Sequence, residues 1–212
     1  DSTRKSDCPP MTFIRLGTSG GVHPDIAPET LAISSYALGL DNTGLYYDQS
    51  PDDEIVERIE IKAKQILTGA ALSPSRFKGK IIPYASKAST EITDALAKQA
   101  AKHNVAFEVG ITVSSPGFYG PSSRFIEGLK NTFPDIKGSL SKLEVDGLRV
   151  LNMEMESSLF FHLCSQMGYR AGTICTVISA STSSDDVVDY DAAIGNTIQI
   201  GLKTLVDLNK AV

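Results

Sequence analysis

Two carboxylates stand close together in the segment 151–158, which reads LNMEMESS. The apolar stretch over residues 149–153 predicts a strand, and the amphipathic stretch that follows it predicts a helix. In an open α/β sheet, ligands bind beyond the carboxyl ends of strands and beside helix N-termini, so Glu154 and Glu156 are candidate ligand-binding residues. The positive end of the helix dipole predicts that both stay ionised at neutral pH. The simpler interpretation is that these acids only begin a helix.

A second set of candidate residues lies in the segment 13–22, which reads FIRLGTSGGV. The pattern predicts a strand that ends in a glycine turn, where positive φ angles would let backbone N–H groups approach an anion. Arg15 is a bidentate phosphate donor, and Thr18 offers a hydroxyl. The segment is neither a P-loop nor a dinucleotide-binding fingerprint. Two interpretations stay open: a phosphate site, or a tight turn in which Arg15 pairs with a structural acid.

The third candidate is the loop over residues 114–124, which reads SSPGFYGPSSR. Two aromatic rings and Arg124 in one loop can stack on a flat ring and hydrogen-bond to its edge, as a nucleobase pocket requires. The alternative is a surface loop that is fixed in place by a buried Phe118.

Strands and helices must bring these three segments together. Hydrophobic periodicity predicts strands over residues 11–16, 31–38, 45–47, 107–113, 149–153 and 171–179. It predicts helices over residues 52–67, 89–103, 140–145 and 191–208, and another helix directly after residue 154. On the last helix, Ile194, Ile198, Leu202 and Leu205 make an apolar stripe. This order of elements implies an α/β protein with a mixed or parallel sheet that is covered on its faces.

The composition narrows the class of protein. The length of 212 residues fits one domain over 1–212, and 42% apolar with 21% charged residues is ordinary for a globular protein. No run approaches the roughly 18 apolar residues of a membrane helix. A net charge of −5 and a pI near 5.2 leave no basic footprint, so we expect neither a membrane nor a nucleic acid as partner. The odd number of cysteines (Cys8, Cys164 and Cys175) favours reduced, structural thiols and a cytoplasmic location.

Taken together and in this order, the three segments resemble the nucleoside phosphorylase family, and within it the uridine phosphorylase branch. The resemblance extends from Phe13 onward and includes an Arg-Ala-Gly strand at Arg170 to Gly172. It implies a three-layer α/β/α sandwich with a mixed central sheet, and assembly as homodimers or as a hexamer of three dimers with active sites at subunit interfaces. It also implies reversible phosphorolysis, in which inorganic phosphate, as co-substrate and without any cofactor or metal, displaces the base from C1′ of the ribose.

The resemblance also implies a role for individual residues. Arg15 and Thr18 would bind phosphate, and Glu156 would accept hydrogen bonds from the ribose hydroxyls, so these three are the predicted catalytic residues. The predicted substrate-binding residues lie around the sugar and the base: Phe118, Ser122, Arg124, Glu154, Met155, Glu156 and Ile178. Phe118 would stack on the base, and Arg124 would reach its carbonyl edge.

The sequence departs from the family pattern in three places. The Gly-Asp-Pro-x-Arg phosphate turn and the N-terminal histidine of the family are absent, so we expect that the N-terminal strands are missing from this chain. Ser122 stands where the uridine enzymes have a glutamine that clamps the uracil amide. Ala180 stands near the place where uridine enzymes have an arginine and purine enzymes an aspartate. A pyrimidine nucleoside is the expected substrate, with a phosphate-independent nucleosidase and a non-catalytic nucleoside-binding protein as alternatives.

Overall fold

A computed structural model describes residues 10–50, 53–179 and 188–210. Within them, the strands are β1 (Thr12–Gly21), β2 (Leu31–Gly39), β3 (Tyr84–Lys87), β4 (Phe107–Ser114), β5 (Glu144–Val145), β6 (Leu148–Glu154) and β7 (Arg170–Ser179). The α-helices are α1 (Glu54–Ala70), α2 (Thr90–Lys102), α3 (Ile136–Leu140), α4 (Ser157–Gln166) and α5 (Tyr190–Lys210). Two 3-10 helices, η1 (Gly44–Tyr46) and η2 (Gly120–Ser122), lie in loops.

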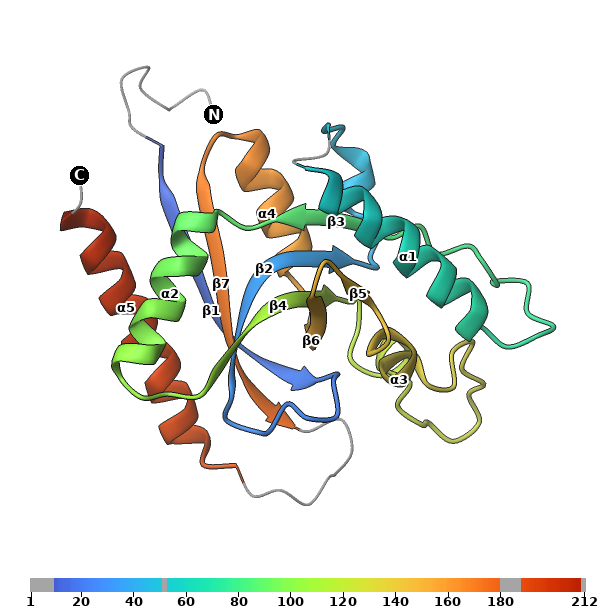
Figure 1. The fold of residues 1–212 in the computed structure, drawn as a ribbon. Coiled ribbons are helices and arrows are strands. Elements are labelled where there is room, and N and C mark those ends of the chain that lie inside the picture. Colours follow the sequence, from blue (N-terminus) through green and yellow to red (C-terminus); the bar gives the residue numbers. More distant parts are fainter. Residues whose placement is uncertain (1–9, 51–52, 180–187, 211–212) are drawn as a thin grey trace.

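The strands form one mixed sheet in the order β1-β7-β2-β4-β6-β5, with β3 paired to β2 (Figure 1). The pairs β1/β7, β2/β4 and β4/β6 are parallel, and β2/β7 and β2/β3 are antiparallel. The predicted α/β class with a mixed sheet is therefore confirmed.

The expected open, three-layer arrangement is not what the described strands form, because the sheet closes on itself. The end of β1 pairs antiparallel with β6, at Gly20 with Met153 and at Gly21 with Asn152. A register shift between Ser19 and Gly20 bends β1 away from β7 and toward β6. The closure places the glycine-rich end of β1 directly beside the strand that carries Glu154. The described residues do not test whether further strands precede β1.

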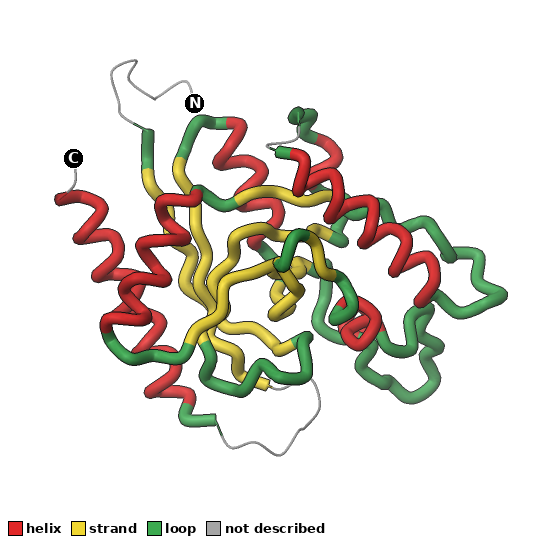
Figure 2. Tube along the Cα trace, in the orientation of Figure 1, coloured by secondary structure: helices red, strands yellow, loops and turns green. Residues whose placement is uncertain are grey.

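Helices surround the closed sheet, as the red segments around the yellow strands show (Figure 2). Helices α2 and α5 pack on each other and on β7, while α4 packs on β2, β3 and β7. Helix α1 begins where Asp53 accepts hydrogen bonds from the N–H groups of Ile55 and Val56, and it lies against α3 and β3. No helix in the described ranges is both long and apolar enough to span a membrane.

A chain of buried polar side chains crosses the inside of the closed sheet. Ser34 and Thr112 share a hydrogen bond of 2.6 Å, and Thr112 donates to Asn152 Oδ1 at 2.8 Å. Asn152 in turn donates to Ser19 Oγ at 2.8 Å. The chain links β2, β4, β6 and β1, so the ends of these strands are held in a fixed relation to one another.

Several predicted elements differ in the structure. The predicted strand over residues 45–47 is the 3-10 helix η1, and the predicted helix over 140–145 is replaced by the end of α3 and by β5. Strand β3 was not predicted. The predicted glycine turn after residue 16 is wrong, because β1 continues to Gly21, and the described glycines with positive φ lie elsewhere, at Gly79, Gly128, Gly147 and Gly168.

The apolar stripe on α5 faces outward in the described structure. Ile194, Ile198, Leu202 and Leu205 are exposed, whereas Ala193, Thr197, Gly201 and Thr204 are buried with Ile200. Small residues occupy the inner face of α5 because the helix approaches β1 closely. A Cβ atom on Gly201 would lie 2.3 Å from Leu16 Cδ2, so a larger side chain has no room there.

Candidate active site

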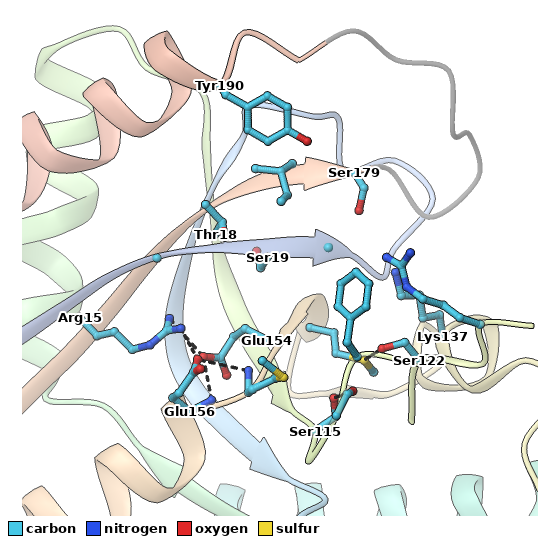
Figure 3. Close-up of a pocket in the computed structure, with 18 residues that line it drawn as sticks. Arg15, Thr18, Ser19, Ser115, Ser122, Lys137, Glu154, Glu156, Ser179 and Tyr190 are labelled. Carbon is cyan, nitrogen blue, oxygen red and sulfur yellow. Dashed lines mark hydrogen bonds and ion pairs between the residues drawn. The ribbon is translucent and has the colours of Figure 1, made fainter. Parts of the chain in front are cut away.

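A cavity of about 620 Å³ opens beside the ends of β1, β6 and β7 (Figure 3). Its lining includes all nine residues that the sequence singles out: Arg15, Thr18, Phe118, Ser122, Arg124, Glu154, Met155, Glu156 and Ile178. These residues come from segments that lie far apart in the chain. The structure therefore brings the three candidate segments together, although the role of each residue stays a prediction.

One end of the cavity, the acidic end, is made by Arg15, Glu154 and Glu156. Glu154 ends β6 and has a side chain that is only 2% exposed. Its carboxylate accepts hydrogen bonds from Ser114 Oγ at 2.6 Å, and from the N–H groups of Glu156 at 3.1 Å and of Ser157 at 3.1 Å. Glu154 thus holds the first turn of α4 and fixes the course of the chain past the cavity.

The helix dipole is not the main influence on the pKa of Glu154. The helix dipole predicts a stabilised charge, but burial raises the pKa of Glu154 above its ordinary value. The positive charge of Arg15 and the hydrogen bonds from Ser114 and the backbone oppose that rise without cancelling it. Glu156 is the more accessible of the two acids, because its side chain is 52% exposed and reaches into the cavity.

Arg15 bridges the two acids. Its Nη1 lies 3.1 Å from Glu154 Oε2 and donates to Cys175 Sγ at 3.0 Å, and its Nη2 donates to Glu156 Oε2. Burial would lower the pKa of Arg15, but the neighbouring Cys175, Glu154 and Glu156 outweigh it and raise the pKa. The pairing of Arg15 with acids is therefore present, though these acids line the cavity and are not remote structural groups.

Gly17 is explained by this arrangement. A Cβ atom at Gly17 would lie 2.6 Å from Arg15 Nη1, so a side chain there would displace the guanidinium from its place against the two acids. Gly17 therefore allows the Arg15 side chain to approach the backbone closely. It does not adopt the positive φ that the sequence suggested.

The opposite end of the cavity, the aromatic end, is made by Phe118, Ser122 and Arg124. The alternative of a buried Phe118 is wrong, since the side chain is 54% exposed. The guanidinium carbon of Arg124 lies 3.9 Å from the centre of the Phe118 ring. Ser122 Oγ lies 3.5 Å from Met153 Sδ, in weak contact with β6. A flat ring entering this end would meet both an aromatic face and a cation.

Ser123 ties the aromatic end to α3. It adopts a left-handed conformation with φ of 56° and donates from Oγ to the carbonyl of Phe133 at 2.7 Å. The same Oγ accepts a hydrogen bond from Ile136 N at 2.9 Å. The loop that carries Phe118 and Arg124 is thus anchored to the helix at the rim of the cavity.

Sequence reasoning missed several lining residues, and those with polar side chains are Ser19, Ser115, Lys137, Ser179 and Tyr190. Lys137 belongs to α3, a helix that the sequence analysis placed four residues too late. The signal that could have found it is Asp135, which caps α3 by accepting from Gly138 N, together with the buried pair Ile136 and Leu140.

A metal centre has no support among the residues of the structure that are described. In the ranges 10–50, 53–179 and 188–210, no group of three or more His, Cys, Asp and Glu side chains is arranged to hold a metal ion. His162 contacts the carbonyl oxygen of Tyr47 through Nε2 at 2.6 Å and lies edge-on to the ring of Tyr84, as expected for a structural histidine.

The fold and the cavity together define a protein of the phosphorylase type. The chain belongs to the Phosphorylase superfamily, whose sequence model matches residues 6–208. The predicted membership of the nucleoside phosphorylase family and its uridine phosphorylase branch is confirmed by the relatives that follow.

The similar proteins are uridine phosphorylases. The chain is 26% identical to the uridine phosphorylase of Haemophilus influenzae, over 94% of this chain and 65% of that protein. It is 29% identical to the uridine phosphorylase of Thermococcus kodakarensis, over 82% of this chain and 50% of that protein. The chain thus spans between half and two thirds of the length of these relatives.

A solved structure of a nucleoside phosphorylase is also similar to this chain. A Trypanosoma brucei nucleoside phosphorylase, described as showing uridine phosphorylase activity, aligns with a TM-score of 0.79 and 28% identity. The alignment covers 97% of this chain and 69% of that one.

Proposed function

We propose that this protein catalyses the reversible phosphorolysis of a nucleoside, with uridine or another pyrimidine nucleoside as the favoured substrate. The observation that carries the proposal is the division of one cavity into an acidic end with Arg15, Glu154 and Glu156 and an aromatic end with Phe118 and Arg124. The distribution suits a ligand that has a hydroxylated sugar at one end and a flat base at the other. The uridine phosphorylases among the relatives support the choice of base.

The proposed chemistry follows from the charges that develop as a glycosidic bond breaks. Positive charge builds on the ribose and negative charge on the departing base, so the site must hold an anionic nucleophile near C1′ and donors near the base. Glu156 would accept hydrogen bonds from the ribose hydroxyls, with Glu154 holding its backbone in place and Met155 against the sugar. Holding phosphate and nucleoside in register contributes several kcal/mol, on the order of the entropy of bringing two reactants together.

Phosphate binding by Arg15 and Thr18 requires Arg15 to share its donors. The guanidinium already pairs with Glu156, so a bound phosphate competes with that carboxylate for Nη2. Thr18 is exposed on β1 and lines the same cavity. We propose that ribose binding draws Glu156 toward the sugar hydroxyls and thereby frees Arg15 for phosphate.

At the aromatic end, Phe118 would stack on the base while Arg124 moves from the ring face to the carbonyl edge of the base. Ser122 and Ile178 would contact the base from either side. Inorganic phosphate is the co-substrate in this proposal, and no cofactor or metal takes part.

The assembly and location are also proposals. We propose one domain over residues 1–212, assembled as a homodimer or hexamer with the active site at a subunit interface, as the resemblance to the nucleoside phosphorylase family implies. A small-molecule nucleoside and phosphate are the proposed partners, without nucleic acid or membrane. A cytoplasmic location is proposed on the cysteines, of which Cys164 and Cys175 are free and buried.

The test is base release from a panel of nucleosides, with and without phosphate. Release of uracil that requires phosphate and yields ribose 1-phosphate is the expected result. Release without phosphate would identify a nucleosidase, and that alternative is favoured by one observation, the engagement of Arg15 by Glu154 and Glu156. Nucleoside binding without any release would identify a non-catalytic binding protein.

A further inference from the structure

Lys137 is a cation inside the cavity that the proposed reaction leaves unused. It is the second residue of α3, between the fully buried Ile136 and the backbone of Gly138, so the course of its main chain is fixed by packing. Figure 3 shows its side chain beside Ser122, at the end of the cavity away from Arg15. Because Lys137 lines the cavity, its ammonium is available to a ligand that enters.

The ammonium of Lys137 lies close to Gly20. A Cβ atom on Gly20 would lie 3.1 Å from Lys137 Nζ and 3.2 Å from Ser179 Oγ, so both polar groups converge on the same point at the end of β1. Gly20 lies opposite Met153 and Ser179 in the sheet. The ammonium therefore stands at the level of the last strand residues, where the base of a bound nucleoside is expected.

The Lys137 ammonium has no anionic partner among the described residues. Within residues 10–50, 53–179 and 188–210, no side chain or carbonyl pairs with Lys137 Nζ. Both acids of the cavity, Glu154 and Glu156, are engaged by Arg15 at the opposite end. Burial and then the neighbouring charge of Arg124 lower the pKa of Lys137. Among the described residues, Lys137 and Arg124 share this end of the cavity without a carboxylate, so we look to the ligand for an acceptor.

We infer that Lys137 is a base-binding residue of the site, whose ammonium donates a hydrogen bond to a carbonyl oxygen of the nucleobase and stabilises the negative charge that forms there as the base departs. The inference rests on the proposed phosphorolysis. Ser122 is short and leaves space in which the longer Lys137 side chain reaches the base. A base with carbonyl acceptors fits this end, and a base with only amino donors does not.

Phosphate replaces the base at C1′ of the ribose. An oxygen of HPO₄²⁻ forms a bond to C1′ while the C1′–N bond breaks, and the electron pair of that bond leaves with the base. The charge spreads from the ring nitrogen to the carbonyl oxygen, where Lys137 donates its hydrogen bond. The proton that the phosphate carried passes through solvent to the base nitrogen. Lys137 keeps its own proton throughout.

The first experiment compares Lys137→Met with Lys137→Arg and with the control Lys142→Met. Lys142 is exposed and follows α3 closely, but it lies outside the cavity. With uridine and phosphate, Lys137→Met is expected to lower kcat/KM by about 10- to 100-fold, the range for loss of one hydrogen bond to a charged group. Lys137→Arg restores a large part of the rate, and Lys142→Met leaves it unchanged. An unaltered rate in Lys137→Met would overturn the inference.

A second readout separates leaving-group stabilisation from a structural role. The fluorine of 5-fluorouridine withdraws electrons and stabilises the departing base anion, so this substrate depends less on an external cation. Lys137→Met is expected to lose several-fold less activity on 5-fluorouridine than on uridine. Equal losses on both substrates would indicate a general disturbance of the site and overturn the inference. Should Lys137→Met not fold, Lys137→Gln, which keeps a polar end without the charge, takes its place in the same comparison.

The design also distinguishes failure of the proposed function from failure of this inference. If the unaltered protein releases no base from uridine in the presence of phosphate, the proposed function fails, and uracil binding is then measured by calorimetry. Binding that is at least about tenfold weaker in Lys137→Met than in the unaltered protein supports the base contact. Equal binding, or no uracil binding by either protein, overturns it.

Discussion

Arg15 on β1 and Glu156 at the start of α4 form an ion pair although they stand 141 positions apart in the sequence. The same guanidinium reaches Glu154, whose side chain is almost fully buried, whereas Glu156 is half exposed. One arginine thus pairs with a buried acid and an accessible one. The buried acid organises the backbone, and the accessible acid lines the cavity.

Replacing Glu156 by glutamine tests its contact with the sugar. The amide accepts hydrogen bonds from ribose hydroxyls more weakly than a carboxylate does. We therefore expect kcat/KM for uridine to fall about 30- to 150-fold, which corresponds to a loss of about 2–3 kcal/mol of transition-state stabilisation. The KM for phosphate should not rise, because Arg15 loses a competing partner. Steady-state kinetics in both substrates measures the two effects. Glu144→Gln, an exposed position on β5, is the control, and an unchanged rate in Glu156→Gln would remove this residue from the mechanism.

Replacing Arg15 separates phosphate binding from stability. Arg15→Lys keeps the charge but loses the two-pronged donor, so the KM for phosphate should rise about tenfold while the melting temperature changes little. Arg15→Met leaves the buried Glu154 without its cation and should also lower the free energy of unfolding by about 1–3 kcal/mol. Phosphate titrations and thermal melts provide the two readouts.

The surface pair of Arg58 with Asp146 gives the comparison for Arg15. Both side chains of that pair are close to half exposed, and exposed pairs contribute about 0–1 kcal/mol. Arg58→Met is therefore expected to leave both phosphate binding and stability nearly unaltered. A phosphate KM that stays constant in Arg15→Lys and Arg15→Met would contradict the phosphate role.

The fold was predictable where local pattern decides it. Continuous apolar segments located β2, β4, β6 and β7 to within a residue or two, because each buries a continuous run of side chains. The closure of the sheet was not predictable in the same way. It depends on two residue pairs between β1 and β6, which lie more than a hundred positions apart and carry no local signal.

Nine residues that line the cavity were predicted from the sequence, whereas the pairing among them was not. Glu154 and Glu156 fall at a strand-to-helix junction, and such junctions lie at the ligand-binding edge of a sheet. Sequence gives no measure of burial, so the rise in the pKa of Glu154 and the engagement of Arg15 came only with the structure. Lys137 was not predicted, because the direction of its side chain depends on how a five-residue helix packs through Ile136 and Leu140.

The pH dependence of stability at the start of α1 follows from Asp53. Burial alone would raise its pKa, but hydrogen bonds from Lys87, Tyr36 and the Val56 N–H outweigh burial and lower it below the ordinary 3.8. A carboxyl whose folded pKa is lowered adds stability that is present above the unfolded pKa and disappears as pH falls through the folded pKa. Asp53→Asn keeps a capping side chain without the charge and should cost about 1 kcal/mol near pH 7.

The expected signature is a difference between Asp53→Asn and the unaltered protein that shrinks as pH falls below about 4, the ordinary range of an aspartate pKa. Denaturant unfolding at pH 7, 5, 4 and 3 measures it. Asp94→Asn, an exposed position on α2, controls for the general effect of net charge. A difference that stays constant or grows toward low pH would show that the charge of Asp53 does not stabilise the fold.

Two glycines offer a matched test of how closely the strands at the site are packed. A Cβ atom on Gly110 of β4 would lie 2.7 Å from the carbonyl oxygen of Arg149, whereas one on Gly195 of α5 would meet open space. Gly110→Ala is expected to lower the free energy of unfolding by about 1–3 kcal/mol, since backbone has to shift. Gly195→Ala is expected to raise it by up to about 1 kcal/mol through helix propensity.

The Gly110 substitution also reaches the active site, because the strand that it displaces is β6. Glu154 ends β6, and Ser114 at the end of β4 donates to Glu154 at 2.6 Å. A shift between β4 and β6 should weaken this contact, so Gly110→Ala should lose activity beyond what its lower stability explains at a temperature where it is fully folded. Unfolding curves and kcat/KM, measured on both alanine variants, test this. Full activity in a folded but destabilised Gly110→Ala would show that the Glu154 contact tolerates movement of its strand.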